Sequence, residues 1–135
     1  MRIKIKIIGD IMLDEWIYGS ATRNSAEAPI NIFETMKVQS SLGGVGNLCI
    51  NLKSLGINFD LFSEIGNDKN GNNIIKILKQ NKIINKIIKT KKVTTIKKRF
   101  YINNLQIFRQ DIENIKINKK VNSKLKKIIN KNDKV

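Results

Sequence analysis

The sequence predicts an α/β fold in which a parallel sheet is flanked by helices, and three observations lead to this prediction. Strand-like and helix-like segments alternate along much of the chain. Residues 3–8 form a strand-like segment that becomes more apolar toward its end, which is typical of a strand buried on both faces. The chain has 135 residues, which is the usual size of one domain.

The first 41 residues predict mostly extended structure. Gly9-Asp10 breaks the first strand, and Gly19-Ser20 turns the chain. Apolar and polar residues alternate over residues 30–38, which indicates a further strand. We therefore expect, in order, a strand, an extended or irregular segment, a small polar loop, a strand and a second loop: residues 3–8, 11–18, 20–29, 30–38 and the stretch through Ser40-Ser41.

Two helices with strands between and after them are expected in the middle of the chain. The first opens at residues 43–47, ends before Gly56 and carries apolar residues at helical spacing: Val45, Leu48, Cys49, Leu52 and Leu55. We expect Cys49 to lie in the core. Residues 57–63 predict a strand, residues 66–71 a loop and residues 83–88 a short extended segment. Residues 72–81 predict a helix with four apolar residues inward: Ile74, Ile75, Ile77 and Leu78.

The last third of the chain predicts a hairpin followed by a helix. Residues 93–102 and 105–112 read as strands, and Asn103-Asn104 between them suits a tight turn. Residues 119–130 predict a lysine-rich helix. Because the strands near residues 14–38 and 93–112 are not followed by helices, we expect them to form a small second sheet beside the main one.

Composition excludes several classes of protein. No run of about 18 apolar residues exists that would predict a transmembrane helix, and charges interrupt the N-terminus before a signal-peptide core could form. The chain has one cysteine and no histidine, which excludes a disulfide framework, a Cys/His zinc site and any catalytic triad that needs histidine. We expect a soluble, reduced, cytoplasmic protein with no membrane partner.

The charge is strongly uneven along the chain. Residues 1–68 carry six basic and eight acidic residues, whereas residues 69–135 carry twenty basic and three acidic residues. A basic half can indicate binding to nucleic acid or to an anionic surface, and a non-catalytic protein that uses residues 69–135 in this way is an alternative function. However, Lys, Ile and Asn, all encoded by AT-rich codons, make up 66 residues. Solvated surfaces in a biased composition therefore explain the charge better, and a nucleic-acid partner is not expected.

Two loops carry residues suited to bind a small molecule. The first, Gly9 to Asp14, follows the first strand, and ligands of open α/β sheets sit beyond the carboxyl ends of strands. Asp10 and Asp14 can accept hydrogen bonds from hydroxyl groups, or they can serve as turn residues. The second, residues 43–47, opens a helix whose first N–H groups lack partners, and Asn47 offers both a donor and an acceptor. Because its pattern is neither a dinucleotide fingerprint nor a Walker A loop, a helix entry without ligand stays equally open.

Together, the two loops and further segments resemble the PfkB (ribokinase-like) sugar kinases, in particular the heptose-7-phosphate kinase domain of bifunctional ADP-heptose synthesis proteins. The segments follow the family's order and spacing over about residues 3–113: IIGDIMLDEWIYG (7–19), SAEAPI (25–30), GGVGN (43–47), NLKSLG (51–56), EIGNDKNG (64–71), TTIKKR (94–99) and LQIFRQD (105–111). The resemblance implies a ribokinase-like sheet with a small β lid, formed by strands near 14–38 and 93–112, that closes over the sugar and often pairs two subunits.

The resemblance also assigns roles to individual residues, with a sugar phosphate as the substrate. It implies that Asp14 and Asn47 bind sugar hydroxyls and that the backbone of Gly43-Gly44 lies against the sugar. Three residues match positions on the lid strands and are candidates for the substrate phosphate: Lys97, Arg99 and Arg109. Their alternative is a surface ion pair, for example between Arg109 and Asp111 or Glu113. Trp16 and Tyr18 are expected to pack within the lid.

The resemblance covers only the N-terminal half of a kinase domain. The family's Gly-Ala-Gly-Asp segment, which carries the catalytic Asp and an anion hole, has no counterpart in this sequence. The ATP-binding region and the adenylyltransferase domain of the bifunctional proteins have none either. We therefore expect ATP and Mg²⁺ to serve the complete domain without being bound by residues present here, and we expect negligible kinase activity from this chain alone.

Overall fold

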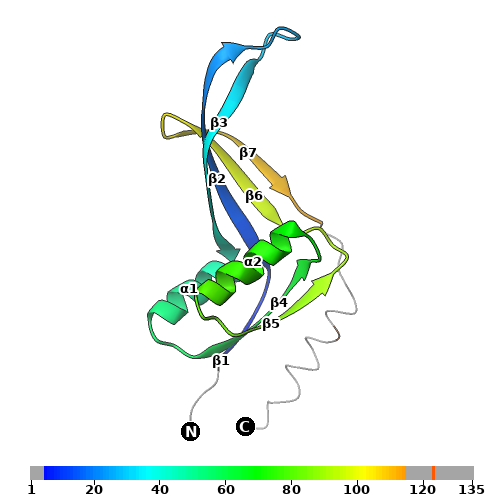
Figure 1. Ribbon diagram of the computed structural model, residues 1–135. Coiled ribbons are helices and arrows are strands. Elements are labelled where there is room, and N and C mark those ends of the chain that lie inside the picture. Colours follow the sequence, from blue (N-terminus) through cyan, green and yellow to red (C-terminus); the bar gives the residue numbers. More distant parts are fainter. Residues whose placement is uncertain (1–4, 115–122, 124–135) are drawn as a thin grey trace.

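Two sheets and two helices make up the described part of the chain (Figure 1). The structure is a computed structural model, which describes residues 5–114 and 123. The elements follow in the order β1 (Ile5–Ile8), β2 (Ile11–Asn24), β3 (Asn31–Gly44), α1 (Val45–Ser54), β4 (Phe59–Gly66), α2 (Lys69–Gln80), β5 (Asn85–Thr90), β6 (Ile96–Ile102) and β7 (Leu105–Ile112).

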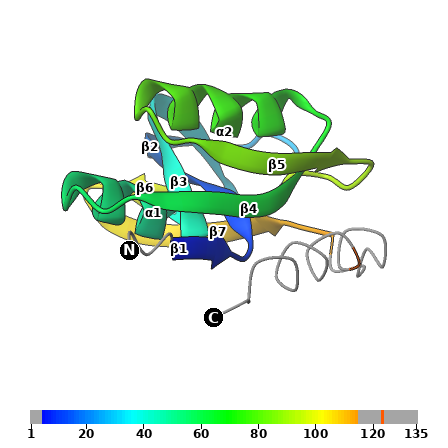
Figure 2. The same cartoon turned by 90° about the horizontal axis from the view of Figure 1, so that it is seen from below.

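The main sheet is parallel and has the strand order β1-β4-β5. Figure 2 shows these strands side by side. Because both crossovers step in the same direction along the sheet, right-handed connections place α1 and α2 on the same face. The core lies between that face and the helices, where fully buried residues meet: Leu61 from β4, Cys49 from α1, and Ile74 and Leu78 from α2. The predicted α/β fold with a parallel sheet is confirmed.

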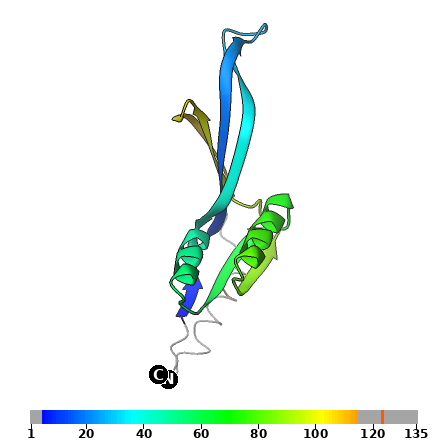
Figure 3. The same ribbon diagram turned by 60° about the vertical axis from the view of Figure 1, so that its left-hand side comes forward.

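The second sheet has the strand order β3-β2-β6-β7. Strands β2 and β6 run parallel, whereas the β2–β3 and β6–β7 pairs are antiparallel. Its long β2–β3 hairpin extends far beyond the main sheet (Figure 3). Asn103 and Asn104 join β6 to β7 with positive φ angles of 48° and 65°, as a tight primed turn requires. The predicted second sheet and its hairpin turn are therefore present.

The strands of the long hairpin extend further than the sequence predicts. The expected loop over residues 20–29 begins only after Asn24, and the expected loop at Ser40-Ser41 is part of β3. Ser40 and Ser41 pair with Glu15 and Asp14, so the ladder holds them in extended conformation. Ser40 and Ser41 lie outside the alternating stretch of residues 30–38, so no local pattern marks them as part of the strand.

Both helices differ from their predicted extents or faces. Helix α2 begins at Lys69 rather than at residue 72, because the Asp68 side chain caps it by accepting a hydrogen bond from the Gly71 N–H. In α1, Cys49 is buried as predicted, and burial raises the pKa of its thiol to about 11. Leu48 and Leu55, which share the helical spacing with Cys49, are 46% and 73% exposed, so the spacing does not mark one buried face.

Two further predictions concern the ends of segments. Strand β4 begins at Phe59 and β5 ends at Thr90, two residues later than predicted in each case. Gly56 follows α1 with a φ of 72°, which fits its predicted place just past a helix end. The predicted helix at 119–130 falls outside the described residues apart from residue 123. Over residues 5–114 and 123, no helix has the length and apolar character needed to cross a membrane.

Candidate functional site

The two loops singled out by the sequence meet at the carboxyl end of β1. The Val45 N–H, at the start of α1, donates to the Asp10 carbonyl oxygen at 3.1 Å. The buried Ser63 hydroxyl donates to the Gly9 carbonyl at 2.6 Å and accepts from the Ile11 N–H at 3.2 Å. These bonds satisfy the backbone where the chain passes from one sheet to the other. They also fix the start of α1 beside the end of β1, where α/β sheets bind ligands.

Asp14 lies against Gly43, the residue next to the start of α1. Strand β2 pairs Met12 with Gly43, which brings the Asp14 side chain over the glycine. A Cβ atom at position 43 would lie only 2.3 Å from the Asp14 Oδ2 atom. Only glycine fits this approach, so the backbone at position 43 and the Asp14 carboxylate form one surface.

Arg99 holds the other oxygen of Asp14. Its Nη1 donates to Asp14 Oδ1 at 2.8 Å, and its guanidinium lies 5.6 Å from the centre of the Trp16 ring. The two charged side chains are only 22% and 17% exposed, so water screens the pair less than it screens a surface ion pair. The ion pair fixes the orientation of the Asp14 carboxylate, whose oxygens can accept hydrogen bonds from hydroxyl groups.

Further charges lie on the same face of the second sheet. In the strand register, Lys97 stands opposite Asp14 on one side and opposite Asp111 on the other, and Arg99 stands opposite Arg109. Arg109 donates to Asp111 twice, through Nε at 2.8 Å and Nη2 at 2.6 Å. These bonds raise the pKa of Arg109 and lower that of Asp111. The face therefore carries three cations beside two carboxylates, and Arg109 forms the ion pair allowed by the sequence.

Gly44 and Asn47 occupy the first turn of α1. Gly44 is the N-cap residue with a φ of 58°, and it supplies no side-chain cap to the helix. Asn47 is exposed, and its side chain makes no hydrogen bond to any other described residue. The structure thus brings Asp14, Gly43, Lys97 and Arg99 together. It leaves Asn47 at the adjacent helix start with its amide open to solvent.

Aromatic side chains support the charged face. Tyr18 stacks on Tyr101 with ring centres 5.4 Å apart, and the Tyr101 hydroxyl donates to Gln106 at 3.1 Å. Trp16 and Tyr18 pack within this sheet as predicted. Neither Tyr101 nor Asp111 was identified from the sequence as part of this face. Their places follow from the strand register, because residues directly opposite each other on paired strands share a face.

The described residues offer no evident metal site. Within residues 5–114 and 123, no group of three or more Cys, Asp or Glu side chains lies close enough together to hold a metal ion. Asp14, the best placed carboxylate, already pairs with Arg99. The residues described here therefore do not fit a resident Mg²⁺ ion, and the chemistry they can carry is recognition of hydroxyl and phosphate groups.

The fold and this face define an α/β protein that is suited to bind a hydroxylated, anionic small molecule. A comparison with family models makes the assignment specific. Residues 3–132 match the model described as pfkB family carbohydrate kinase. The chain belongs to the PfkB family of carbohydrate kinases.

Curated relatives from several bacteria match most of the chain. The Bifunctional protein HldE of Aliarcobacter butzleri is 37% identical over 134 residues, which is 94% of this chain and 28% of that protein. The protein of the same name from Helicobacter acinonychis is 38% identical over 112 residues, which is 82% of this chain and 24% of that protein. The chain therefore spans about a quarter of the length of the curated relatives that it matches.

Solved structures share the fold at low sequence identity. Phosphofructokinase-2 from Escherichia coli, in complex with fructose-6-phosphate, aligns with a TM-score of 0.76 at 14% identity and covers 96% of this chain and 42% of that one. A carbohydrate kinase from Agrobacterium tumefaciens aligns with a TM-score of 0.63 at 18% identity, over 81% of this chain and 35% of that one. The ribokinase-like fold expected from the sequence is confirmed, and the chain holds part of it.

Proposed function

We propose that this chain is the sugar-binding part of a kinase that transfers the γ-phosphate of ATP to O1 of D-glycero-D-manno-heptose 7-phosphate, in the formation of ADP-heptose for lipopolysaccharide. The observation that carries the proposal is the Asp14 carboxylate, held by Arg99 against the backbone of Gly43 beside further cations. The similarity to the HldE proteins and the sequence resemblance to heptose-7-phosphate kinases support the choice of sugar.

Asp14 and Asn47 would bind the hydroxyl groups of the sugar. The Asp14 carboxylate accepts from hydroxyls, and the open Asn47 amide can both donate and accept. Gly43 and Gly44 have no side chain, so the sugar ring can lie directly against their backbone. This set matches a polyol better than an apolar ligand.

Three cations are available for the phosphate of the substrate. Arg99 and Lys97 lie beside Asp14, and Arg109 lies on the next strand with one edge bound to Asp111. Arginine and lysine recognise phosphate through charge-assisted hydrogen bonds. Arg99 would share its guanidinium between Asp14 and the phosphate, which couples hydroxyl and phosphate recognition.

ATP with Mg²⁺ would supply the phosphoryl group. Both would be bound by the part of the family domain for which this sequence has no counterpart. Residues of this chain would hold the acceptor and exclude water from it when the second sheet closes as a lid. Such a reaction would take place in the cytoplasm, where ATP is available.

The lid would also pair two copies of this chain. Strands β3 and β7 are the edges of the second sheet, and large apolar side chains are exposed along them. Met36, Val38 and Phe108 are 77%, 52% and 58% exposed. Exposed apolar edge strands are suited to pairing. Sedimentation of the Met36→Asp/Phe108→Asp double variant as a monomer, with a dimeric parent chain, would support this assembly.

The sugar site is tested by binding. We expect D-glycero-D-manno-heptose 7-phosphate to shift the backbone NMR signals of Gly43, Gly44 and Asn47 in the labelled chain. Asp14→Ala and Asn47→Ala should each weaken binding by more than about tenfold, because each removes hydrogen bonds to the sugar. Asn58→Ala is the matched control, since Asn58 is exposed and lies just before β4.

The kinase reaction is tested in a chimera. The chain replaces the matching segment of the Aliarcobacter butzleri relative, and ADP formation is measured with the heptose phosphate and with fructose 6-phosphate. Activity that depends on Asp14 and prefers the heptose phosphate would support the proposal.

If Asp14→Ala and Asn47→Ala both bind the heptose phosphate as tightly as the parent chain does, the proposed sugar site is refuted. Salt-sensitive retention of the chain on DNA, without sugar binding, would favour the alternative of a basic nucleic-acid-binding protein.

A further inference from the structure

Asp68 makes a set of contacts that the sugar site does not use. Its Oδ1 atom accepts from the Gly71 N–H at 2.7 Å and from the Thr94 hydroxyl at 2.7 Å. Its Oδ2 atom accepts from the Thr94 N–H at 2.8 Å. One carboxylate therefore caps α2 and at the same time holds a residue 26 positions later in the chain. A helix cap needs only the first of these bonds.

Thr94 is itself tightly enclosed. It is 1% exposed, and its hydroxyl accepts from the Gly66 N–H at 3.0 Å, at the end of β4. A Cβ atom at position 66 would lie 2.4 Å from the Lys92 carbonyl oxygen and 2.5 Å from Asp68 Oδ2. The chain entering β6 is thus fixed against the main sheet at one point, by packing as well as by hydrogen bonds.

That point continues directly into the sugar site. The next residue, Thr95, accepts through its carbonyl from the Leu13 N–H at 3.0 Å. Strand β6 then pairs Ile96 with Leu13 and Lys97 with Asp14, and Arg99 reaches back to Asp14. Thr94 therefore lies directly before the stretch of chain whose cations stand beside Asp14.

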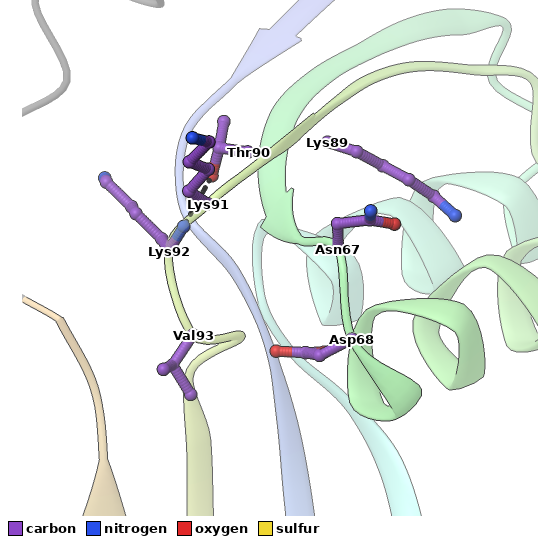
Figure 4. Close-up of a pocket in the computed structure, with 7 residues that line it drawn as sticks. All are labelled: Asn67, Asp68, Lys89, Thr90, Lys91, Lys92 and Val93. Carbon is purple, nitrogen blue, oxygen red and sulfur yellow. Dashed lines mark hydrogen bonds between the residues drawn. The ribbon is translucent and has the colours of Figure 1, made fainter.

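The hollow next to this network does not suggest a separate anion site. It measures about 650 Å³ and is lined by residues 67–68 and 89–93 (Figure 4). Two of its lysines have partners, since Lys92 pairs with Glu64 and Lys89 donates to Asn72 at 2.7 Å. Figure 4 shows the Asp68 carboxylate pointing toward the segment around Val93, which leads into β6, rather than outward.

We propose that Asp68 is a positioning residue: through Thr94 it anchors the start of strand β6 to the main sheet, and it thereby holds Lys97 and Arg99 in register beside Asp14. The inference about the anchor rests on contacts alone. Its consequence for substrate affinity rests on the proposed function.

Asp68→Asn separates the anchor from the helix cap. Asparagine caps helices as well as aspartate, and its oxygen can keep the bond from Gly71. Its NH₂ group would face the Thr94 N–H, so the backbone bond from Thr94 is lost, while the retained oxygen can still accept from the Thr94 hydroxyl. Thr94→Val removes the hydroxyl alone, and Thr94→Ser keeps it. Asp60→Asn is the matched control, since Asp60 is 8% exposed and pairs with Lys86 within the main sheet.

Hydrogen–deuterium exchange of the full chain without ligand measures the anchor. We expect Asp68→Asn and Thr94→Val to speed exchange over residues 96–99 at least about fivefold relative to β4, with α2 unchanged in Asp68→Asn. Thr94→Ser should restore protection, and Asp60→Asn should leave the ratio between β6 and β4 unchanged. Exchange within about twofold of the parent in both Asp68→Asn and Thr94→Val would overturn the anchor, as would equal acceleration of β4 and β6. If one variant does not fold, the other decides.

Binding separates this inference from the proposed function. When the parent chain binds the heptose phosphate, Asp68→Asn should weaken that binding several-fold although Asp68 lies outside the sugar site, and Thr94→Ser should not. Unchanged affinity despite faster exchange would refute the positioning role. No binding by the parent, with the expected exchange pattern, would refute the proposed function and leave the anchor standing.

Discussion

The main sheet and the second sheet of this chain differ in how far their strands are buried. In β4 of the main sheet, only Phe59 and Glu64 are not fully buried, and two helices cover one face. In β7 of the second sheet, every residue except Ile112 is exposed. The main sheet with its helices supplies the larger part of the buried apolar core, to which the second sheet adds Ile11, Leu13, Leu42 and Ile96. The second sheet instead presents the charged face.

The contrast extends to how charges are used. In the second sheet, Asp14, Arg99 and Arg109 share one face, where Arg99 donates to Asp14 and Arg109 donates to Asp111. In the main sheet, Asp68 receives its bonds from one helix start and one strand entry, where it joins the two sheets. The predictions below test whether stability and recognition are divided between the sheets in this way.

The largest effect is expected in the main sheet. Leu61→Ala should lower the free energy of unfolding by about 2–5 kcal/mol, because Leu61 is fully buried in the central strand and its truncation leaves a cavity. Leu105→Ala in β7 is the matched change, and it should alter stability by less than about 0.5 kcal/mol, since Leu105 is 69% exposed. Denaturant unfolding measures both values. Similar losses would show that the second sheet carries as much of the core as the main sheet.

A methyl group at Gly43 should damage recognition more than stability. Gly43→Ala places its Cβ against Asp14 Oδ2, so the carboxylate must move away from Arg99 and from the sugar. We expect binding of the heptose phosphate to weaken more than about tenfold. Gly56→Ala is the control, because it strains a residue with positive φ but meets no atom within 4 Å. It should cost stability and leave binding intact, and calorimetric titration with thermal unfolding distinguishes the two results.

The junction at Asp68 should show a pH-dependent contribution to stability. Although desolvation by burial opposes ionisation, hydrogen bonds from the Thr94 and Gly71 N–H groups and the Thr94 hydroxyl lower its pKa below the ordinary 3.8. The stabilisation is therefore complete above pH 3.8 and is lost as the pH falls through the lower folded pKa. At pH 7, Asp68→Ala should lower the free energy of unfolding by about 1 kcal/mol, because the helix cap is lost. This difference between the parent chain and the variant, measured by denaturant unfolding, should become smaller in acid. A difference that grows in acid contradicts the lowered pKa.

The smallest effect is expected at the far end of the hairpin. Arg23 and Glu34 form an ion pair at 3.0 Å with side chains that are 66% and 49% exposed. A double-mutant cycle with Arg23→Ala and Glu34→Ala should give a coupling of less than about 1 kcal/mol, which vanishes in about 1 M salt. A larger, salt-resistant coupling would mean that another surface covers the hairpin tip in solution.

Several elements were predictable because their signals are local. The Gly-rich start of α1, the turn at Asn103-Asn104 and the positive φ of Gly56 each follow from residue types that favour one backbone conformation. Strand β3 was predicted only in part, because its polar residues are held by pairing with β2, which lies far outside a local window. Leu48 and Leu55 share the helical spacing of the buried Cys49 and are exposed, because spacing alone does not tell which part of a face the sheet covers.

The candidate site divides in the same manner. The sequence by itself determined the α/β class, the two sheets, the glycines at 43 and 44, and the family resemblance that marks Asp14 and Asn47, since motifs and periodicity are properties of short segments. Only the tertiary structure decided that Arg99 binds Asp14 and that Asp68 holds Thr94. These contacts join residues that lie far apart in the sequence, through strand register and crossover geometry, and so no local sequence pattern marks them.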